Sequence, residues 1–361
     1  MSDRGSNSGR RVGGYSSSPL SDDSHALSQM QSLKSRPPWA ASAASSYVRS
    51  GSYRDINLRS AHVYVEEVAM QDWPAHILQL AEALAGPGGG PAPAVLQPNP
   101  TLTDDPLRES AVTLAGQVSN YRLKSESDWM ELNRRVLSVL EHDHLIKSQD
   151  RRFDAQVGPT SDTNLFLSTP TPDLAFGLPT SLDEDADEPL SRSLLTQWYN
   201  LRGVQAFPSP GRPDMAFPCL IYEAEPDTGN LVAPENQASY GAAKALSMIQ
   251  SLRNRYHELG GSRMSERLPV IVICSRGPIY EVLVAFDLHA NEIPPKTTDP
   301  ASAKSTAKAG VHLVEIWTGS VHRPEVMYLF QLLLNRVLSW FLATFRPTII
   351  NMINTVKASV S

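Results

Sequence analysis

Cysteine is scarce in this sequence, which contains only Cys219 and Cys274 in 361 residues. Each lies inside an apolar run that is typical of a buried strand, and neither belongs to a spaced set of Cys or His residues. The sequence therefore excludes a disulfide-stabilised scaffold and a thiolate zinc site. We expect an intracellular protein, nuclear or cytoplasmic, in a reducing compartment.

The sequence also lacks a long uninterrupted hydrophobic run. Residues 1–18 contain no apolar segment that would serve as the core of a signal peptide, so we do not expect secretion. The longest apolar stretch, residues 326–345, is interrupted by Gln331, Asn335 and Arg336, and an arginine at the centre of a bilayer costs about 3 kcal/mol. We therefore expect a core helix there and no membrane partner.

Positive charge is not in excess, because the formal net charge is -6. Such a chain has no global field to attract phosphate, so any contact with DNA or RNA must come from a local basic patch. One candidate patch follows a predicted helix and its C-terminal loop, and a solvated helix face explains it about as well. Its members are Lys244, Arg253, Arg255, Arg263, Arg267 and Arg276.

Large apolar residues are rare in residues 1–54, which are dominated by Ser, Arg and Gly. Such a segment cannot bury enough surface to offset its ordering entropy, so we expect a disordered tail. The remaining residues, 55–361, are expected to form a single domain. A Pro/Gly-rich loop near residues 86–106 interrupts it.

The pattern of apolar residues after the tail predicts helices and short strands in alternation. Ser125 and Asp128 predict a capped helix start, and Pro234 fits the first turn of a later helix that ends at Gly260. This order of elements predicts an α/β fold with a central mixed sheet flanked by helices. Helices are expected at 76–85, after 125, at 234–252 and at the C-terminus, and strands at 153–157, 174–176, 219–222, 269–274, 279–286 and 311–317.

Three acids carry the most informative pattern in the chain. Glu223 and Glu225 end an apolar strand and project from the same face, because side chains alternate along a strand. Asp173 follows a proline that marks a strand start, so we expect it on an adjacent strand near an open end. Carboxylates in this arrangement suit Mg²⁺ or Mn²⁺, although acid pairs at strand ends are also common solvated features.

The run Pro172-Asp173, followed by Glu223-Ala-Glu225 and by a helix opening at residues 235–240, resembles the PD-(D/E)XK nuclease-like superfamily. It is similar to a large group of fungal proteins with such domains. The resemblance extends more loosely over nearly everything after the tail, and it implies a nuclease-like α/β core. It also implies that Asp173 and Glu223 bind Mg²⁺ or Mn²⁺, that Gln237 supports the site, and that Glu126 faces it.

The sequence departs from that family at Glu225, where the family usually has a lysine that activates water and neutralises developing charge. Glu225 would act as a third metal ligand or as a base, or would merely face solvent. Lys244 shares a helix face with Gln237 and is one candidate for the lysine role, but it lies roughly 10 Å further along the axis. A lysine at the rim of the core is the preferred interpretation.

Two functional hypotheses follow. The first is Mg²⁺-dependent hydrolysis of DNA or RNA phosphodiesters, with Asp173, Glu223, Glu225 and Gln237 as catalytic residues. The second is a catalytically silent relative that serves as a nucleic-acid or protein interaction module, which Glu225 and the acidic net charge favour.

Overall fold

The computed structural model describes residues 50–86, 106–121, 124–154, 169–182, 188–260, 267–293 and 308–359. All of these fall in one unit, residues 46–361. Most of the expected tail and the expected loop (residues 87–105) lie outside the described residues. The tail was predicted to extend to residue 54, yet Tyr53 is buried and Arg54 forms an ion pair, so folded structure begins before that boundary.

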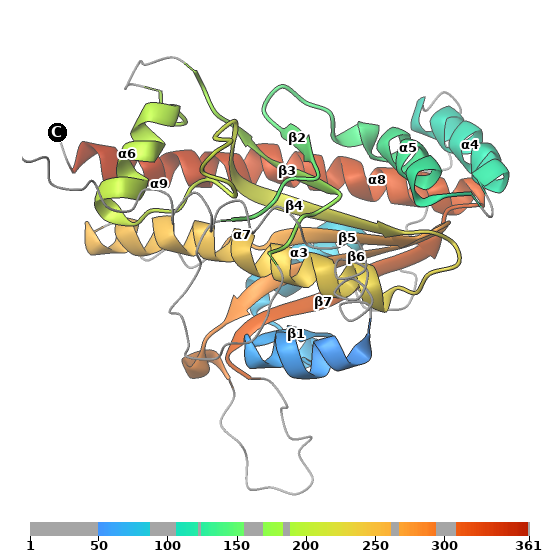
Figure 1. Cartoon of the computed structure of the whole chain (residues 1–361), viewed down its shortest axis with the longest axis horizontal. Coiled ribbons are helices and arrows are strands. Elements are labelled where there is room, and N and C mark those ends of the chain that lie inside the picture. The colour runs from blue at the N-terminus through green and yellow to red at the C-terminus, as the bar shows by residue number, and fades with distance from the viewer. Residues whose placement is uncertain are drawn as a thin grey trace, which may run out of the picture. The chain divides into compact units, whose positions relative to one another are not determined.

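A mixed sheet of seven strands forms the centre of the fold, as the sequence predicts (Figure 1). The strand order is β1-β7-β6-β5-β4-β3-β2. The pairs β1–β7 and β4–β5 are parallel, and the other neighbours are antiparallel. The strands are β1 (Val63–Val65), β2 (Ile146–Gln149), β3 (Leu174–Pro179), β4 (Met215–Glu225), β5 (Val270–Arg276), β6 (Ile279–Leu288) and β7 (Gly310–Ser320).

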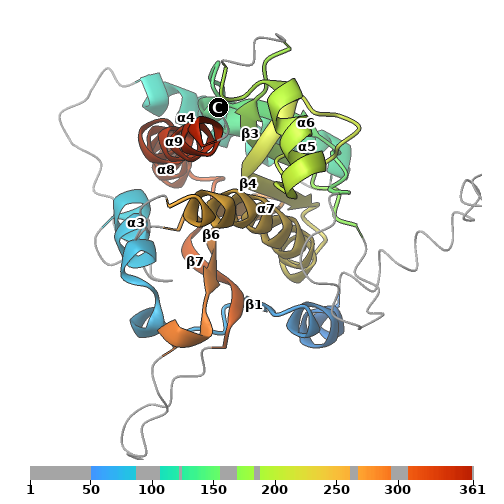
Figure 2. The ribbon, with the colours of Figure 1, turned by 90° about the vertical axis from the view of Figure 1, so that its left-hand side faces the viewer.

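Helices cover both faces of this sheet (Figure 2). The predicted capped helix is α5, in which Ser125 and Asp128 form the expected capping box. The α-helices are α3 (Ala75–Ala85), α4 (Pro106–Val118), α5 (Glu126–Val136), α6 (Arg192–Arg202), α7 (Val232–Glu258), α8 (Pro324–Trp340) and α9 (Arg346–Ala358). Shorter helical segments are η1 (Tyr53–Leu58), η2 (Met70–Asp72), η3 (Ser119–Tyr121), η4 (Leu137–Leu140), η5 (Ala290–Glu292) and η6 (Phe341–Phe345).

The two faces of the sheet receive different helices. α7 packs on the face that carries Ile221, because a Cβ added to Gly241 of α7 would lie 3.5 Å from the Ile221 side chain. The opposite face carries Tyr280, whose hydroxyl donates to Asn133 of α5 and whose ring packs on Phe330 of α8. Strand β4 is buried along its whole length, which explains its unbroken apolar run.

The long C-terminal helix is the predicted core helix. One helix among the described residues, Pro324–Ala358, is apolar and long enough to cross a membrane by composition and length alone. Its α8 part buries Phe330 and Leu333 in the core, and Phe330 stacks on Trp317. Two of its polar residues have protein partners, since Gln331 donates to Ser110 and Arg336 donates to the Leu84 carbonyl.

One predicted strand is wrong in the part that can be checked. Phe153 and Asp154, the first residues of the expected 153–157 strand, are not in a strand, and residues 155–157 lie outside the described ranges. The strand in this region is β2, which ends at Gln149, four residues before Phe153, and lies at the edge of the sheet beside β3. Its sequence, Ile-Lys-Ser-Gln, is largely polar because an edge strand needs no continuous apolar run, so periodicity did not reveal it.

Candidate functional site

Asp173 lies directly beside the β4 segment that carries the two glutamates. It precedes β3, whose first residue, Leu174, pairs with Tyr222. The Asp173 carboxylate Oδ2 accepts a hydrogen bond from the backbone N–H of Ala224, at 2.8 Å. The predicted adjacency is therefore confirmed, and we refer to Asp173, Glu223 and Glu225 as the Glu223 cluster.

Glu223 and Glu225 are almost completely buried, each with 3% of its surface exposed. The alternative in which Glu225 merely faces solvent is therefore wrong. The turn that follows β4 encloses this residue, because a Cβ added to Gly229 would lie 3.0 Å from the Glu225 Oε2 atom. Glycine at this position lets the turn approach the carboxylate closely.

The two α7 residues that were expected at the site lie in different environments. Lys244 donates from Nζ to the Phe153 carbonyl, at 2.9 Å, and its Nζ lies 5.4 Å from the centre of the Tyr240 ring. Burial lowers the Lys244 pKa, and the residue fits the preferred interpretation of a lysine at the core rim. Gln237 is half-buried, one helical turn before Gly241, on the α7 face that meets Ile221 and Pro172.

Glu126 is the first residue of α5, and its side chain is not among those described. The prediction that it faces the site therefore stays a prediction. The start of its helix does lie near Asp173, because Ser127 of the same helical turn lines a cleft together with Asp173.

Strand β5 supplies two neighbours that the sequence did not reveal. Glu223 pairs laterally with Cys274, and Glu225 pairs with Arg276 at the matching ends of these parallel strands. The Arg276 Nε atom is buried and has no hydrogen-bond partner among the described residues. Burial, with the charges of Glu235 and Glu281, raises the pKa of the Cys274 thiol well above its usual range, so this thiol stays protonated.

The Glu223 cluster has suitable ligand atoms but is not a preformed cage. Hard cations such as Mg²⁺ favour carboxylate oxygens, which all three residues supply. Within the ranges that the structure describes, no three His, Cys, Asp or Glu residues form a group that would hold a metal ion. Binding a cation would require these carboxylates to turn toward a common point.

A second group of acids lies on the same face of the sheet, two strands from Glu223, with Cys274 between them. We refer to Glu66, Glu235, Glu281 and Glu315 as the Glu281 cluster. Its geometry depends on strand order, because the four glutamates come from the end of β1, the first turn of α7, β6 and β7. No local sequence pattern indicates it.

The Glu281 cluster retains protons. Burial, with the charge of Glu235 and a hydrogen bond to it, raises the pKa of Glu281 to about 8. Burial, with the charges of Glu66 and Glu235, raises the pKa of Glu315 to about 7. Arg54 of η1 supplies a compensating cation, since it pairs with Glu235 and donates from Nε to Asn236 at 3.0 Å.

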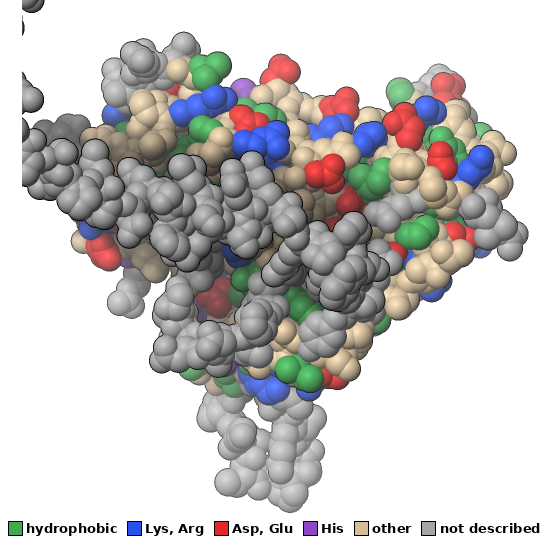
Figure 3. All heavy atoms as spheres, viewed as in Figure 1, with side chains coloured by type: hydrophobic (Ala, Val, Ile, Leu, Met, Phe, Trp, Pro, Cys, Tyr) green, Lys and Arg blue, Asp and Glu red, His purple; other side chains and the backbone are tan. Residues whose placement is uncertain are grey.

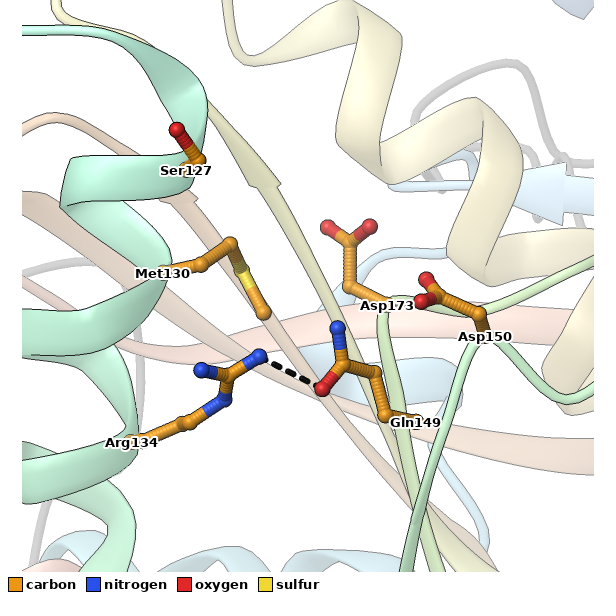
Figure 4. Close-up of a pocket in the computed structure, with 6 residues that line it drawn as sticks. All are labelled: Ser127, Met130, Arg134, Gln149, Asp150 and Asp173. Carbon is orange, nitrogen blue, oxygen red and sulfur yellow. Dashed lines mark hydrogen bonds between the residues drawn. The ribbon is translucent and has the colours of Figure 1, made fainter.

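A cleft of about 420 Å³ opens beside the Glu223 cluster, and Asp173 is the residue that the two share (Figure 4). α5 forms one wall and the end of β2 forms the other. On the face of the molecule in Figure 3, positive and negative side chains are interspersed over the described surface, which offers no extended positive area there. The cleft is lined by Ser127, Met130, Arg134, Gln149, Asp150 and Asp173.

Comparison of the chain with models of known protein families, and with proteins of established annotation, gives no match. The resemblance to the PD-(D/E)XK nuclease-like superfamily therefore stays a prediction. It rests on the motif residues and on an α/β fold whose seven-stranded mixed sheet is flanked by helices.

Proposed function

We propose that this protein hydrolyses phosphodiester bonds of DNA or RNA in a reaction that depends on Mg²⁺ or Mn²⁺. One observation carries the proposal. The Asp173 carboxylate is hydrogen-bonded to the backbone of Ala224, the residue between Glu223 and Glu225. Three acids from two neighbouring segments of the sheet therefore lie at the same end of it, which supports the proposal.

The roles follow from the position of each side chain. Asp173 and Glu223 would hold the cation, and Glu225 would be a third ligand or accept a proton from water. Gln237 would orient groups from its position on α7. When bound, Mg²⁺ would polarise the phosphate and lower the pKa of water. Arg276, the register partner of Glu225 on β5, is a candidate for the charge that the family's lysine supplies.

The silent relative is the second candidate, and three observations favour it. Glu225 replaces the lysine, and the Lys244 ammonium is bound to the Phe153 carbonyl. The described carboxylates also lack the geometry of a preformed metal site. In this case the same fold would bind nucleic acid or protein without cleaving it.

Calorimetric titration with Mg²⁺ and Mn²⁺, followed by cleavage assays on single- and double-stranded DNA and RNA, separates the two candidates. We expect the parent to bind the cation and cleave, and Glu223→Gln to lose at least about 100-fold in cleavage rate. The control is Glu109→Gln, the same substitution at an exposed position on α4. Cation binding without cleavage supports the silent relative, and no cation binding overturns both the metal site and the hydrolytic proposal.

A further inference from the structure

The cleft beside Asp173 presents its polar groups in a defined orientation. The Arg134 guanidinium donates from Nη2 to the Gln149 side-chain oxygen. Because a guanidinium can only donate, the amide oxygen must face Arg134, and the amide Nε2 must face away from it. Figure 4 shows this Nε2 directed between Met130 and Asp173, so the cleft contains a fixed hydrogen-bond donor.

Asp150 supplies an acceptor on the same side of the cleft. It follows β2 directly and has a left-handed backbone with φ of 48°, a conformation that Asp tolerates better than most residues. Its N–H donates to the Asp173 carbonyl, at 3.2 Å, which fixes the end of β2 against the start of β3. The neighbouring Arg151 is buried and donates from Nε to Ser148 at 2.9 Å, so this wall is held by the protein core.

Met130 gives the cleft an apolar surface between these polar groups. Its side chain is 8% exposed and extends from α5 into the cleft (Figure 4). A thioether is polarizable and packs well against a flat aromatic ring. The cleft volume, about 420 Å³, lies within the range of about 300–1,000 Å³ that is usual for small-molecule sites.

These features suit a nucleobase better than a phosphate. Two carboxylates, Asp150 and Asp173, are among the described residues that line the cleft, and the Arg134 guanidinium there donates to Gln149 and forms an ion pair with Glu131. A phosphate inside the cleft would be repelled, whereas a base edge offers both an acceptor for an amide and a donor for a carboxylate. In a duplex the face of each base is covered by its stacked neighbours and its Watson–Crick edge is occupied, whereas an unpaired, unstacked base can place its face on Met130 and its free edge against Gln149 and Asp150.

We propose that this cleft binds one unpaired nucleobase of a single-stranded substrate, next to the phosphate that would lie at Asp173. The inference rests on the proposed function, because the phosphate at Asp173 would be the one whose bond is cleaved. The base would pack on Met130, accept from the Gln149 amide and donate to the Asp150 carboxylate. The substrate class is therefore single-stranded DNA or RNA, or a strand with an unpaired base.

The test measures binding without cleavage. Fluorescence anisotropy of labelled 12-nucleotide DNA and RNA strands with the full chain, in Ca²⁺ instead of Mg²⁺, compares single strands, duplexes and strands in which the central nucleotides are abasic. We expect single strands to bind at least tenfold more tightly than duplexes or abasic strands. Gln149→Glu keeps the bond to Arg134 but removes the donor, and Met130→Ala removes the packing surface. Each should weaken single-strand binding by roughly five- to tenfold.

Gln197→Glu, at an exposed position on α6, is the matched control and should bind like the parent. The inference is overturned by affinities of both cleft variants within twofold of the parent, by equal binding of duplex and single strand, or by no binding of any strand. Its failure is distinct from failure of the proposed function, which is decided on the same preparations by Mg²⁺ titration and cleavage. A parent that binds Mg²⁺ and cleaves while the cleft variants are unaffected disproves only the base site.

Discussion

The Glu223 cluster and the Glu281 cluster place acids on the same face of one sheet, but their buried negative charge is compensated in different ways. The Glu281 cluster is neutralised from within, because Arg54 pairs with Glu235 and raised pKa values keep protons on Glu281 and Glu315. The Glu223 cluster lies at the ends of β4 and β3, beside a cleft and under a glycine-containing turn.

The comparison teaches that a group of acids is not by itself a metal site. A cluster that already holds an arginine and protons gains less from a cation, since metal binding must displace what neutralises it. The Glu223 cluster has its carboxylates on neighbouring strands, with Arg276 as a lateral neighbour. Stabilisation of the protein by Mg²⁺ should therefore depend on the Glu223 cluster, and the pH dependence of its stability should depend on the Glu281 cluster.

The largest expected effect is on stabilisation by Mg²⁺. A cation at about 100 times its Kd should raise the free energy of unfolding of the parent by about 3 kcal/mol. Glu223→Gln should lose this gain, and Glu281→Gln should keep it, because only the former removes a proposed ligand. Urea unfolding with and without Mg²⁺ measures both. An equal loss in the two variants would break the distinction between the clusters.

The second largest effect is expected from removing the Arg54 charge that neutralises part of the Glu281 cluster. Arg54→Met should lower the free energy of unfolding by about 2 kcal/mol at pH 8, because it leaves the partly buried Glu235 without its partner. The cost should be smaller at pH 5.5, where neighbouring carboxyl groups hold protons. Arg59→Met is the control. Its ion pairs are more exposed, so it should cost less than Arg54→Met at either pH.

Glu281 should make stability depend on pH in the opposite sense to an ordinary ion-paired acid. Its pKa is raised from 4.5 to about 8, so between these values the folded state holds a proton that the unfolded state has released. Stability therefore falls as pH rises through this window. Glu281→Gln should gain about 1 kcal/mol over the parent at pH 8.5, a figure reduced for the solvent contact that Glu281 retains.

The same substitution should gain nothing from this source at pH 4, because Glu281 is protonated in both states there. Chemical denaturation across the pH range provides the measurement. A variant that runs parallel to the parent from pH 4 to pH 8.5 would show that Glu281 does not hold the proton.

The smallest expected effect is that of Glu225→Gln in the metal-free protein. The substitution keeps the shape of a buried side chain and removes one of three neighbouring charges, so stability should be equal to that of the parent or up to about 0.5 kcal/mol higher. The gain from Mg²⁺ should be smaller than in the parent. Thermal melts of both proteins with and without Mg²⁺ measure this difference. Identical Mg²⁺-induced shifts in melting temperature would show that Glu225 is not part of the metal site.

The parts of the fold that were predictable are those set by local patterns. The Ser125 cap, the Gly260 stop and the two strands β5 and β6 each depend on a few consecutive residues. The placement of Glu223 and Glu225 on one face of a buried strand depends only on the alternation of side chains. Asp173 was placed correctly beside them because a proline marks the start of its strand.

The remaining features depend on contacts between distant segments. The Glu281 cluster exists because β1, β6 and β7 lie side by side and α7 begins above them, an order that no local pattern encodes. The pairing of Arg276 with Glu225 depends on strand register in the same way. The cleft residue Gln149 ends an edge strand whose polar sequence hides it.

The short strand β1 also protects one edge of the sheet from pairing with other chains. It covers the edge of β7, where the Val311 N–H donates to the His62 carbonyl and the Glu66 N–H donates to the Leu313 carbonyl, each at 2.8 Å. Proteolysis just after residue 66 would remove this cover and leave the edge amides and carbonyls of residues 311–313 in β7 without partners. Such an edge recruits strands from other molecules, so a few residues at the start of the fold protect the protein from self-association.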